Sequence, residues 1–307
     1  MKKALLYYKS IYYLRSFQKK YHVSLGVKEF GSDMVEFERK QRDQLLIEAL
    51  ENQTPFLVGK FGGAEMFAMR TAEFDERRNK AKACEQLCVC AGFFPNVPQR
   101  LKEFNQIMKE TAGEIDLLEK WDKPCEDYFI DKYCKKMKGF CSVPLYWGEE
   151  KPWTSALKGK RVLVISPFEK SIRKQYARKE KLFRDPTVLP EFELLTIKAV
   201  QTQGDEVDSR FTDWFEALHF MYAQIDELDF DIAFIGCGAY GLPLGAYIKK
   251  KGKVAIHMGG ALQLMFGIWG KRWETSTIRT LKNEYWIRPS EEEQIKGMEK
   301  VEGGCYW

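Results

Sequence analysis

Residues 231–273, DIAFIGCGAYGLPLGAYIKKKGKVAIHMGGALQLMFGIWGKRW, decide how the chain is organised. The stretch begins within a short apolar run, 230–235, that is rich in strand-forming residues. The glycine pattern Gly236-x-Gly238-x-x-Gly241 follows at once. A helix is predicted after this pattern, because the proline at 243 suits a first turn and the glycine at 252 suits a helix end.

A second strand is predicted at 253–258, where it meets Gly259 and Gly260, and a further helix is predicted over 261–269. Two parallel strands joined by a short helix form a βαβ unit. If the strands are neighbours, the helices that follow them point their N-termini at one crevice. The unpaired N–H groups and partial positive charge of such a crevice suit a phosphate or pyrophosphate. Lys271 and Arg272 would add full charges nearby.

The glycine pattern has the form of a dinucleotide-binding fingerprint, but its context argues against NAD. That fingerprint needs an acidic residue about 20 positions later, at the end of the next strand. Here the strand ends in IHMG, without an acid. An oxidoreductase and a methyltransferase are therefore disfavoured, and the lack of a GKS or GKT sequence disfavours an NTPase. A phosphate-bearing ligand remains, beside the plainer interpretation that Gly236, Gly238 and Gly241 only permit tight turns. His257 is open in the same way: it would hydrogen-bond a phosphate or sugar hydroxyl, or cap a backbone carbonyl.

Residues 55–65, PFLVGKFGGAE, repeat the order of buried strand, glycines and helix. Glu65 would stand near the N-terminus of that helix, and the C-terminal ends of strands are where α/β proteins place ligand chemistry. An acid is also favourable in the first turn of any helix, so both interpretations stay open. A helix over 32–53 is predicted before this strand.

The remaining elements follow the same alternation. Strands are predicted at 162–168 and 192–200, and an amphipathic helix at 211–225. Residues 80–150 look mostly helical and irregular, with a helix start at 96–98. We therefore expect a Rossmann-like α/β fold, an open and mainly parallel sheet with helices on both faces. Its expected parts are an N-terminal helical segment, 1–53, packed on a main domain, 54–307.

Aromatic residues mark two further features. The pieces 92–95, GFFP, and 146–147, YW, are candidates for a pocket wall, although such residues more often belong to the core. The polar tail, 284–307, contains Trp286, Tyr306 and Trp307. We expect this tail to wrap back on the domain, because a free tail has no need of large aromatic side chains.

Residues 1–22, MKKALLYYKSIYYLRSFQKKYH, contain six Lys or Arg and no acid, interleaved with apolar and aromatic residues. One interpretation is a basic amphipathic helix that lies on an anionic membrane surface. The other, which we favour, is an ordinary first helix packed on the domain with a solvated basic face.

Composition limits the class of protein. The 307 residues carry a net charge of only +5, with charges of both signs, so nucleic acid is not an expected partner. The eight cysteines are scattered, and Cys84-x3-Cys88-x-Cys90 fits no zinc spacing well. Because no secretory signal precedes them, we expect reduced thiols and a cytoplasmic location. No apolar run reaches the length of a membrane span.

Several of these segments together resemble one family. Residues 60–65, KFGGAE, are similar to the Arg-Phe-Gly-Asp-Gly-Glu segment of the GT-D fold glycosyltransferases. The stretch 236–273 resembles the second glycine-rich half of that group, especially its GT-D-like bacterial branch. The segment RVLVISPFEKSI and the ending VEGGCYW are also similar to that branch. The resemblance covers roughly residues 54–307, and its 236–273 stretch is the more specific part.

The resemblance implies a Rossmann-like domain that transfers a hexose from a nucleotide sugar, in particular a UDP-sugar, to a growing surface polysaccharide or glycoprotein glycan. The acceptor would be lipid-linked or protein-linked. The implied place is the cytoplasm, at the inner face of the plasma membrane if residues 1–22 contact lipid. In the family an Asp-x-Glu pair is associated with a divalent metal, Mn²⁺ or Mg²⁺, on the donor pyrophosphate. This chain keeps the acid as Glu65 but has Gly63 in place of the Asp, so its dependence on metal is open.

The resemblance implies a role for each residue of the expected site. Glu65 would bind a metal, hold sugar hydroxyls or act as the base, and Lys60 would add charge in place of the family Arg. Gln263 would contact base or ribose. The donor phosphates would meet the glycine turns, His257 and the basic pair at Gly62, Gly63, Gly236, Gly238, Gly241, Gly259, Gly260, Lys271 and Arg272. The alternatives are a non-catalytic protein that binds a nucleotide sugar or a glycan-assembly partner, an oxidoreductase, and a scaffold on the membrane.

Overall fold

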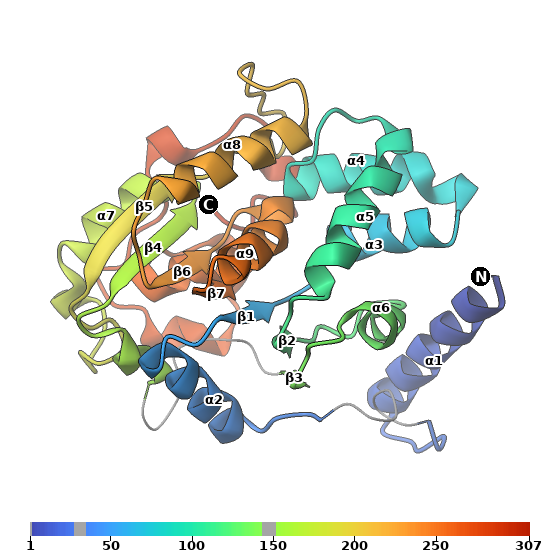
Figure 1. The fold of residues 1–307 in the computed structure, drawn as a ribbon, viewed down its shortest axis with the longest axis horizontal. Helices are drawn as coiled ribbons and strands as arrows, with labels where there is room; N and C mark the ends of the chain where they lie inside the picture. Colours follow the sequence, from blue (N-terminus) through green and yellow to red (C-terminus); the bar gives the residue numbers. More distant parts are fainter. Residues whose placement is uncertain (1, 28–34, 143–151) are drawn as a thin grey trace.

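The computed structural model describes residues 2–27, 35–142 and 152–307, and its centre is a single open sheet (Figure 1). The sheet has seven strands in the order β3-β2-β1-β7-β6-β4-β5, and every pairing between them is parallel. The strands are β1 (Phe56–Gly59), β2 (Leu117–Glu119), β3 (Gly139–Cys141), β4 (Arg161–Ser166), β5 (Glu193–Lys198), β6 (Ile232–Ile235) and β7 (Val254–His257). The predicted Rossmann-like α/β class is confirmed.

Helices cover both faces of this sheet. One face is covered by α2 (Arg39–Glu51) and α7 (Glu169–Tyr176). The other face is covered by α3 (Gly63–Glu73), α4 (Lys80–Ala91), α5 (Leu101–Ala112), α6 (Glu126–Tyr133), α8 (Trp214–Asp226) and α9 (Gly241–Lys250). The strands supply both cores by alternation, so that Val162 and Val164 of β4 face one core while Leu163 and Ile165 face the other. Burial on both faces explains why the central strands read as continuous apolar runs.

The predicted neighbours β6 and β7 do pair, with Phe234 opposite Ile256. The connection between them begins with a short 3-10 turn, Gly238–Tyr240, before α9 starts. The segment after β7 is a 3-10 helix, η6 (Gly259–Phe266), instead of the predicted longer helix over 261–269. It stops early because Gly267 takes a left-handed conformation, with φ of 61°, and Ile268 then pairs with Ile287.

Two other predictions need correction. Residues 80–150 contain the strands β2 and β3, which are three residues each and too short to give a periodic signal. The helix predicted over 32–53 begins at Arg39, because the chain before it is extended: Phe37 donates its N–H to the carbonyl of Phe140 at 2.8 Å. Residues 32–34 of that prediction, and the aromatic pair 146–147, lie outside the described residues.

The N-terminal helix α1 (Lys2–Tyr21) contacts the elements near α6 (Figure 1). The ammonium of Lys9 lies 3.0 Å from a carboxylate oxygen of Glu76, and the Tyr8 hydroxyl donates to Asp131 at 3.1 Å. Arg15 is buried and forms an ion pair with Asp127. Within the described ranges, none of the helices combines the length and apolar character needed to cross a bilayer.

Candidate active site

A pocket of about 340 Å³ lies at the C-terminal edge of the sheet. Its walls are the segments that directly follow five strands that are adjacent in the sheet, β2, β1, β7, β6 and β4. These segments contribute Trp121 and Lys123 after β2, Lys60 to Glu65 after β1, His257 with Gly259 to Ala261 at the end of β7, Gly236 to Gly238 after β6, and Pro167 and Phe168 after β4. The volume falls in the range of small-molecule sites, and the location is the one that open α/β sheets use for ligands.

Lys60 stands at the centre of the wall that β1 supplies. Its ammonium lies 3.5 Å from a carboxylate oxygen of Glu119 and 5.6 Å from the centre of the Trp121 ring. Gly259 permits this position, since it has a φ of 57° and a Cβ there would lie 2.8 Å from Cε of Lys60. Lys60 therefore presents a positive charge between β1 and β7, beside an exposed aromatic ring.

Glu65 lies in the first turn of α3 and is buried. Its carboxylate folds back over Gly62, where a Cβ would be only 2.1 Å from Oε2, so any side chain at that position would push the carboxylate away from its present place. Burial raises the pKa of Glu65, and Glu302 raises it further, while the backbone amide of Glu65 and the charge of Lys60 act in the opposite direction. The result is a carboxyl group that is more basic than an exposed glutamate and lines the pocket.

His257 is the last residue of β7 and lines the same pocket as Lys60. The imidazole is buried, with 3% of its surface exposed, and Nδ1 has no hydrogen-bond partner among the described residues. Burial lowers its pKa to about 3, with a further contribution from the charge of Lys60. His257 is therefore neutral at physiological pH and retains hydrogen-bonding capacity that the fold does not use.

Two more cations face the same pocket. Lys123 reaches over the start of α3, where its Nζ lies 3.9 Å from the position that a Cβ of residue 63 would occupy. No ion-pair partner for this ammonium occurs in the parts of the chain that the structure describes. Arg272 stacks on the Tyr306 ring, with Cζ 4.7 Å from the ring centre, and pairs with Glu302.

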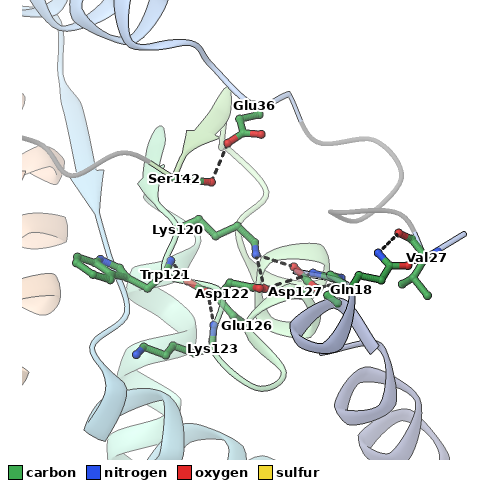
Figure 2. Close-up of polar contacts among 11 residues, drawn as sticks. Gln18, Val27, Glu36, Lys120, Trp121, Asp122, Lys123, Glu126, Asp127 and Ser142 are labelled. Atoms are coloured by element: carbon green, nitrogen blue, oxygen red, sulfur yellow. Dashed lines mark hydrogen bonds and ion pairs between the residues drawn. The ribbon is translucent and has the colours of Figure 1, made fainter. Parts of the chain in front are cut away.

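The loop that carries Trp121 and Lys123 is held from below by a buried carboxyl group. Figure 2 shows Glu126 accepting hydrogen bonds from the backbone N–H groups of Trp121, at 3.3 Å, and Lys123, at 2.8 Å. Burial raises the pKa of Glu126 to about 7, although the charge of Lys120 acts to lower it. The loop is thus positioned by the fold, while the Trp121 side chain stays 47% exposed at the mouth of the pocket.

The structure brings most of the predicted site residues together. The pocket is lined by Lys60, Gly62, Gly63, Glu65, Gly236, Gly238, His257, Gly259, Gly260 and Arg272. Three predicted residues lie outside this lining. Gly241 packs against the His257 ring, Gln263 is buried and donates to the carbonyl of Tyr306 at 3.1 Å, and Lys271 donates to the carbonyl of Gly303 at 3.2 Å.

Two of the segments whose contributions sequence reasoning missed bear on the chemistry of the pocket. Trp121 and Lys123 follow β2, and recognition of β2 as a strand would have placed them at the same edge as Lys60. Glu302 and Tyr306 come from the C-terminal tail, which was expected to wrap back on the domain and does so. Its Trp307 donates to the carbonyl of Glu293 at 3.0 Å and contacts the ring of Phe168.

The residues around Glu65 do not fit a metal site of their own. Among the described residues, no group of three or more His, Cys, Asp and Glu side chains is placed to hold a metal ion. At the position where the resemblance implies a second acid, the chain has Gly63 with the Lys123 ammonium beside it. The Lys123 ammonium therefore lies beside the position where the resemblance implies an acid, and its charge would repel a divalent ion held there.

Comparisons with known proteins add little to this description. No protein-family model matches the chain, and a search of curated proteins gave no match. A solved structure described as a domain of unknown function 1792 aligns with 82% of this chain and 96% of its own length, at 11% sequence identity and a TM-score of 0.35. A similarity this low supports no functional argument.

Proposed function

We propose that the protein is a glycosyltransferase that takes a sugar, in particular a hexose, from a nucleotide sugar. The observation that carries this proposal is the composition of the one edge of the sheet described above. It combines the cations Lys60, Lys123 and Arg272 with a buried carboxyl group and glycine turns. Sugar transfer from a nucleotide diphosphate needs such a combination, because the leaving diphosphate gains negative charge while an acceptor hydroxyl loses a proton.

In this proposal the donor diphosphate lies between Lys60 and Lys123, over the start of α3. The first N–H groups of α3 would add partial positive charge, and the adjacent residues Gly62 and Gly63 leave the backbone accessible. Arg272 would reach the diphosphate from the opposite wall. These fixed charges would stabilise the leaving group at the moment that the bond to the anomeric carbon breaks.

We further propose that Lys123 takes over the charge role that the resemblance gives to a divalent metal. Its ammonium beside Gly63 would neutralise the diphosphate directly, and no step is assigned to a metal ion. The expectation of Mn²⁺ or Mg²⁺ at Glu65 is replaced here by this arrangement. The proposal predicts that chelation of divalent ions leaves donor turnover unchanged.

The acid–base role falls to Glu65. Its raised pKa makes it a stronger base than an exposed glutamate, which suits removal of a proton from an acceptor hydroxyl. His257, being neutral, would hydrogen-bond a phosphate oxygen or a sugar hydroxyl through its free ring nitrogen. Trp121 would offer its exposed face to the flat side of a sugar or base.

Replacement of Glu65 by glutamine tests the assignment. Glu65→Gln preserves size and removes the base, so we expect release of nucleotide diphosphate from the correct donor to fall by a factor of at least about 100. Donor hydrolysis is the readout, since it needs no knowledge of the acceptor. Glu284→Gln, an exposed glutamate outside the pocket, is the matched control. Turnover of Glu65→Gln near that of the control would remove Glu65 from the mechanism.

One alternative follows from a specific residue. Gly63 in place of the family acid favours a non-catalytic protein that binds a nucleotide sugar or supports a glycan-assembly partner. Binding of a donor without measurable hydrolysis or transfer, in the wild-type protein, would support this alternative.

A further inference from the structure

We propose that the outward side of α1 is a docking surface for an anionic lipid bilayer. The exposed large side chains of this helix are Leu6, Tyr7, Tyr13, Leu14, Phe17 and Tyr21, and each has between 43% and 69% of its surface exposed. We call them the outer face of α1. Their spacing of three, four and seven residues places them along one side of the helix. Isolated exposed apolar residues need no explanation, but a row of them along one helix does.

The opposite side of α1 already has its partners. Ala4, Leu5 and Tyr8 pack against the main core, and Lys9 and Arg15 are engaged by acidic residues of the domain. The apolar residues of the outer face are therefore not needed to hold the helix in place. The exposed side of α1 therefore carries leucine and aromatic side chains in addition to the expected exposed lysines.

The lysines at both ends of the outer face of α1 indicate which kind of partner binds there. Lys2 and Lys3 are exposed at one end of α1, and Lys19 and Lys20 are exposed at the other. The sequence contains no acidic residue before Glu29. A helix with aromatic and leucine side chains on one side, bounded by lysines at both ends, matches the interface of a bilayer with anionic headgroups. Tyrosine rings favour the headgroup level, and long lysine side chains can extend from the apolar boundary to the phosphates.

A second copy of the chain fits this surface less well. In a two-fold dimer the same patch faces itself, so the lysines of both copies would be brought together with no acid on α1 to pair with them. An anionic surface provides the missing countercharge. Because no described helix can cross a bilayer, the contact would be peripheral, with α1 lying in the plane of the interface.

The docking surface is coupled to the pocket through one buried ion pair. Arg15 of α1 pairs with Asp127 and lies 3.4 Å from Asp122, and both acids belong to the segment that follows Trp121. Figure 2 shows Asp122, which belongs to the loop of Trp121 and Lys123, with Asp127 beside it. Bilayer contact would therefore be made by a helix that is anchored to the mouth of the pocket. Membrane binding itself does not depend on the proposed reaction.

The test is co-sedimentation of the full chain with vesicles. We expect binding to vesicles of equal parts phosphatidylcholine and phosphatidylglycerol, weakening with salt, and little binding to phosphatidylcholine alone. Glutamine keeps helix propensity and removes charge or apolar surface, so it serves for both variants. The charge variant is K2Q/K3Q/K19Q/K20Q, and the apolar variant is L6Q/Y13Q/F17Q. Each lysine contributes about fivefold to the partition coefficient, so the charge variant should lose about a hundredfold or more. The apolar variant should lose about tenfold or more.

The matched control removes the same number of exposed lysines elsewhere, as K158Q/K174Q/K250Q/K296Q. Its affinity for the anionic vesicles should stay within about twofold of that of the wild type. That result would show that binding depends on the lysines of α1 and not on the net charge of the protein. Unchanged thermal melting of all variants shows that they are folded. Three results overturn the proposal: no binding by the wild type, binding by both α1 variants that equals that of the wild type, or a wild-type dimer in sedimentation velocity that the apolar variant converts to monomer.

Discussion

The neutral, buried His257 should make the folded protein sensitive to mild acid. In the unfolded chain an imidazole has its ordinary pKa of about 6.5, whereas burial lowers the pKa of His257 to about 3 in the fold. Between these two pH values the imidazole is protonated in the unfolded chain but stays neutral in the folded protein. Stability is therefore complete above pH 6.5 and falls as the pH is lowered toward 3.

The loss of unfolding free energy can be calculated from the interval between the two pKa values of His257. Each pH unit within it costs about 1.4 kcal/mol, so lowering the pH from 7 to 5 removes about 2 kcal/mol of unfolding free energy through this one group. His257→Gln has no proton to gain and should lack this contribution. The difference in unfolding free energy between pH 7 and pH 5 should thus be about 2 kcal/mol smaller in the variant than in the wild type.

Urea unfolding at the two pH values measures this difference directly. Comparison of pH dependences, instead of absolute stabilities, cancels the carboxylates that both proteins share and any general loss of stability in the variant. His219→Gln is the matched control, because His219 is exposed on α8 and lies outside the pocket. If His257→Gln loses as much stability as the wild type between pH 7 and 5, the imidazole is not held neutral and its proposed role fails.

Three further predictions concern the pocket and one half-buried acid, Glu73. Lys123→Ala should weaken donor binding by about tenfold or more, as expected for the loss of a charge-assisted contact, whereas Lys174→Ala on α7 should not; calorimetric titration compares them. Gly63→Asp restores the acid that the resemblance implies, but we expect it to pair with Lys123 and weaken donor binding similarly; stronger binding in the presence of Mn²⁺ would contradict the proposed role of Lys123. Although burial acts to raise it, hydrogen bonds from partners such as Tyr133 lower the pKa of Glu73 to about 2. Glu73→Gln should therefore cost about 2 kcal/mol at neutral pH and remove the decline of stability as the pH falls from 4.5 toward 2, which urea unfolding would detect.

The parts of the fold that the sequence predicts are those with strong local signals. β1, β4, β6 and β7 are apolar runs of four to six residues buried on both faces. Glycine or proline follows each closely in the sequence, so their existence and parallel arrangement could be inferred. The edge strands β2 and β3 have three residues each, and their pairing is fixed by distant partners such as Val58 opposite Leu117. Local sequence carries no record of such partners.

The contrast between local signals and distant pairing also explains which site residues could be predicted from the sequence. Glu65, His257 and the predicted glycines other than Gly241 lie at or shortly after the ends of predicted strands, and the structure places them on one pocket. Lys123 reaches Gly63 only because β2 pairs with β1, a contact between distant segments. Gln263 was expected to contact the ligand. Its side-chain amide instead donates a hydrogen bond to the backbone carbonyl of Tyr306 in the C-terminal tail. Pairing of distant segments therefore decides the residues that sequence reasoning missed or placed elsewhere.

The proposed glycosyltransferase activity requires that the pocket bind a nucleotide sugar. A thermal-shift screen would use UDP-, GDP-, CMP- and dTDP-sugars and NAD(P), each with Mn²⁺ and with a chelator. A ligand at about 100 times its Kd adds roughly 2.7 kcal/mol, which moves Tm by several degrees in a chain of this size. We predict a shift with one class of nucleotide sugar, equal in Mn²⁺ and in chelator, and none with NAD(P). No shift with any nucleotide sugar, or a shift with NAD(P) alone, would contradict the account.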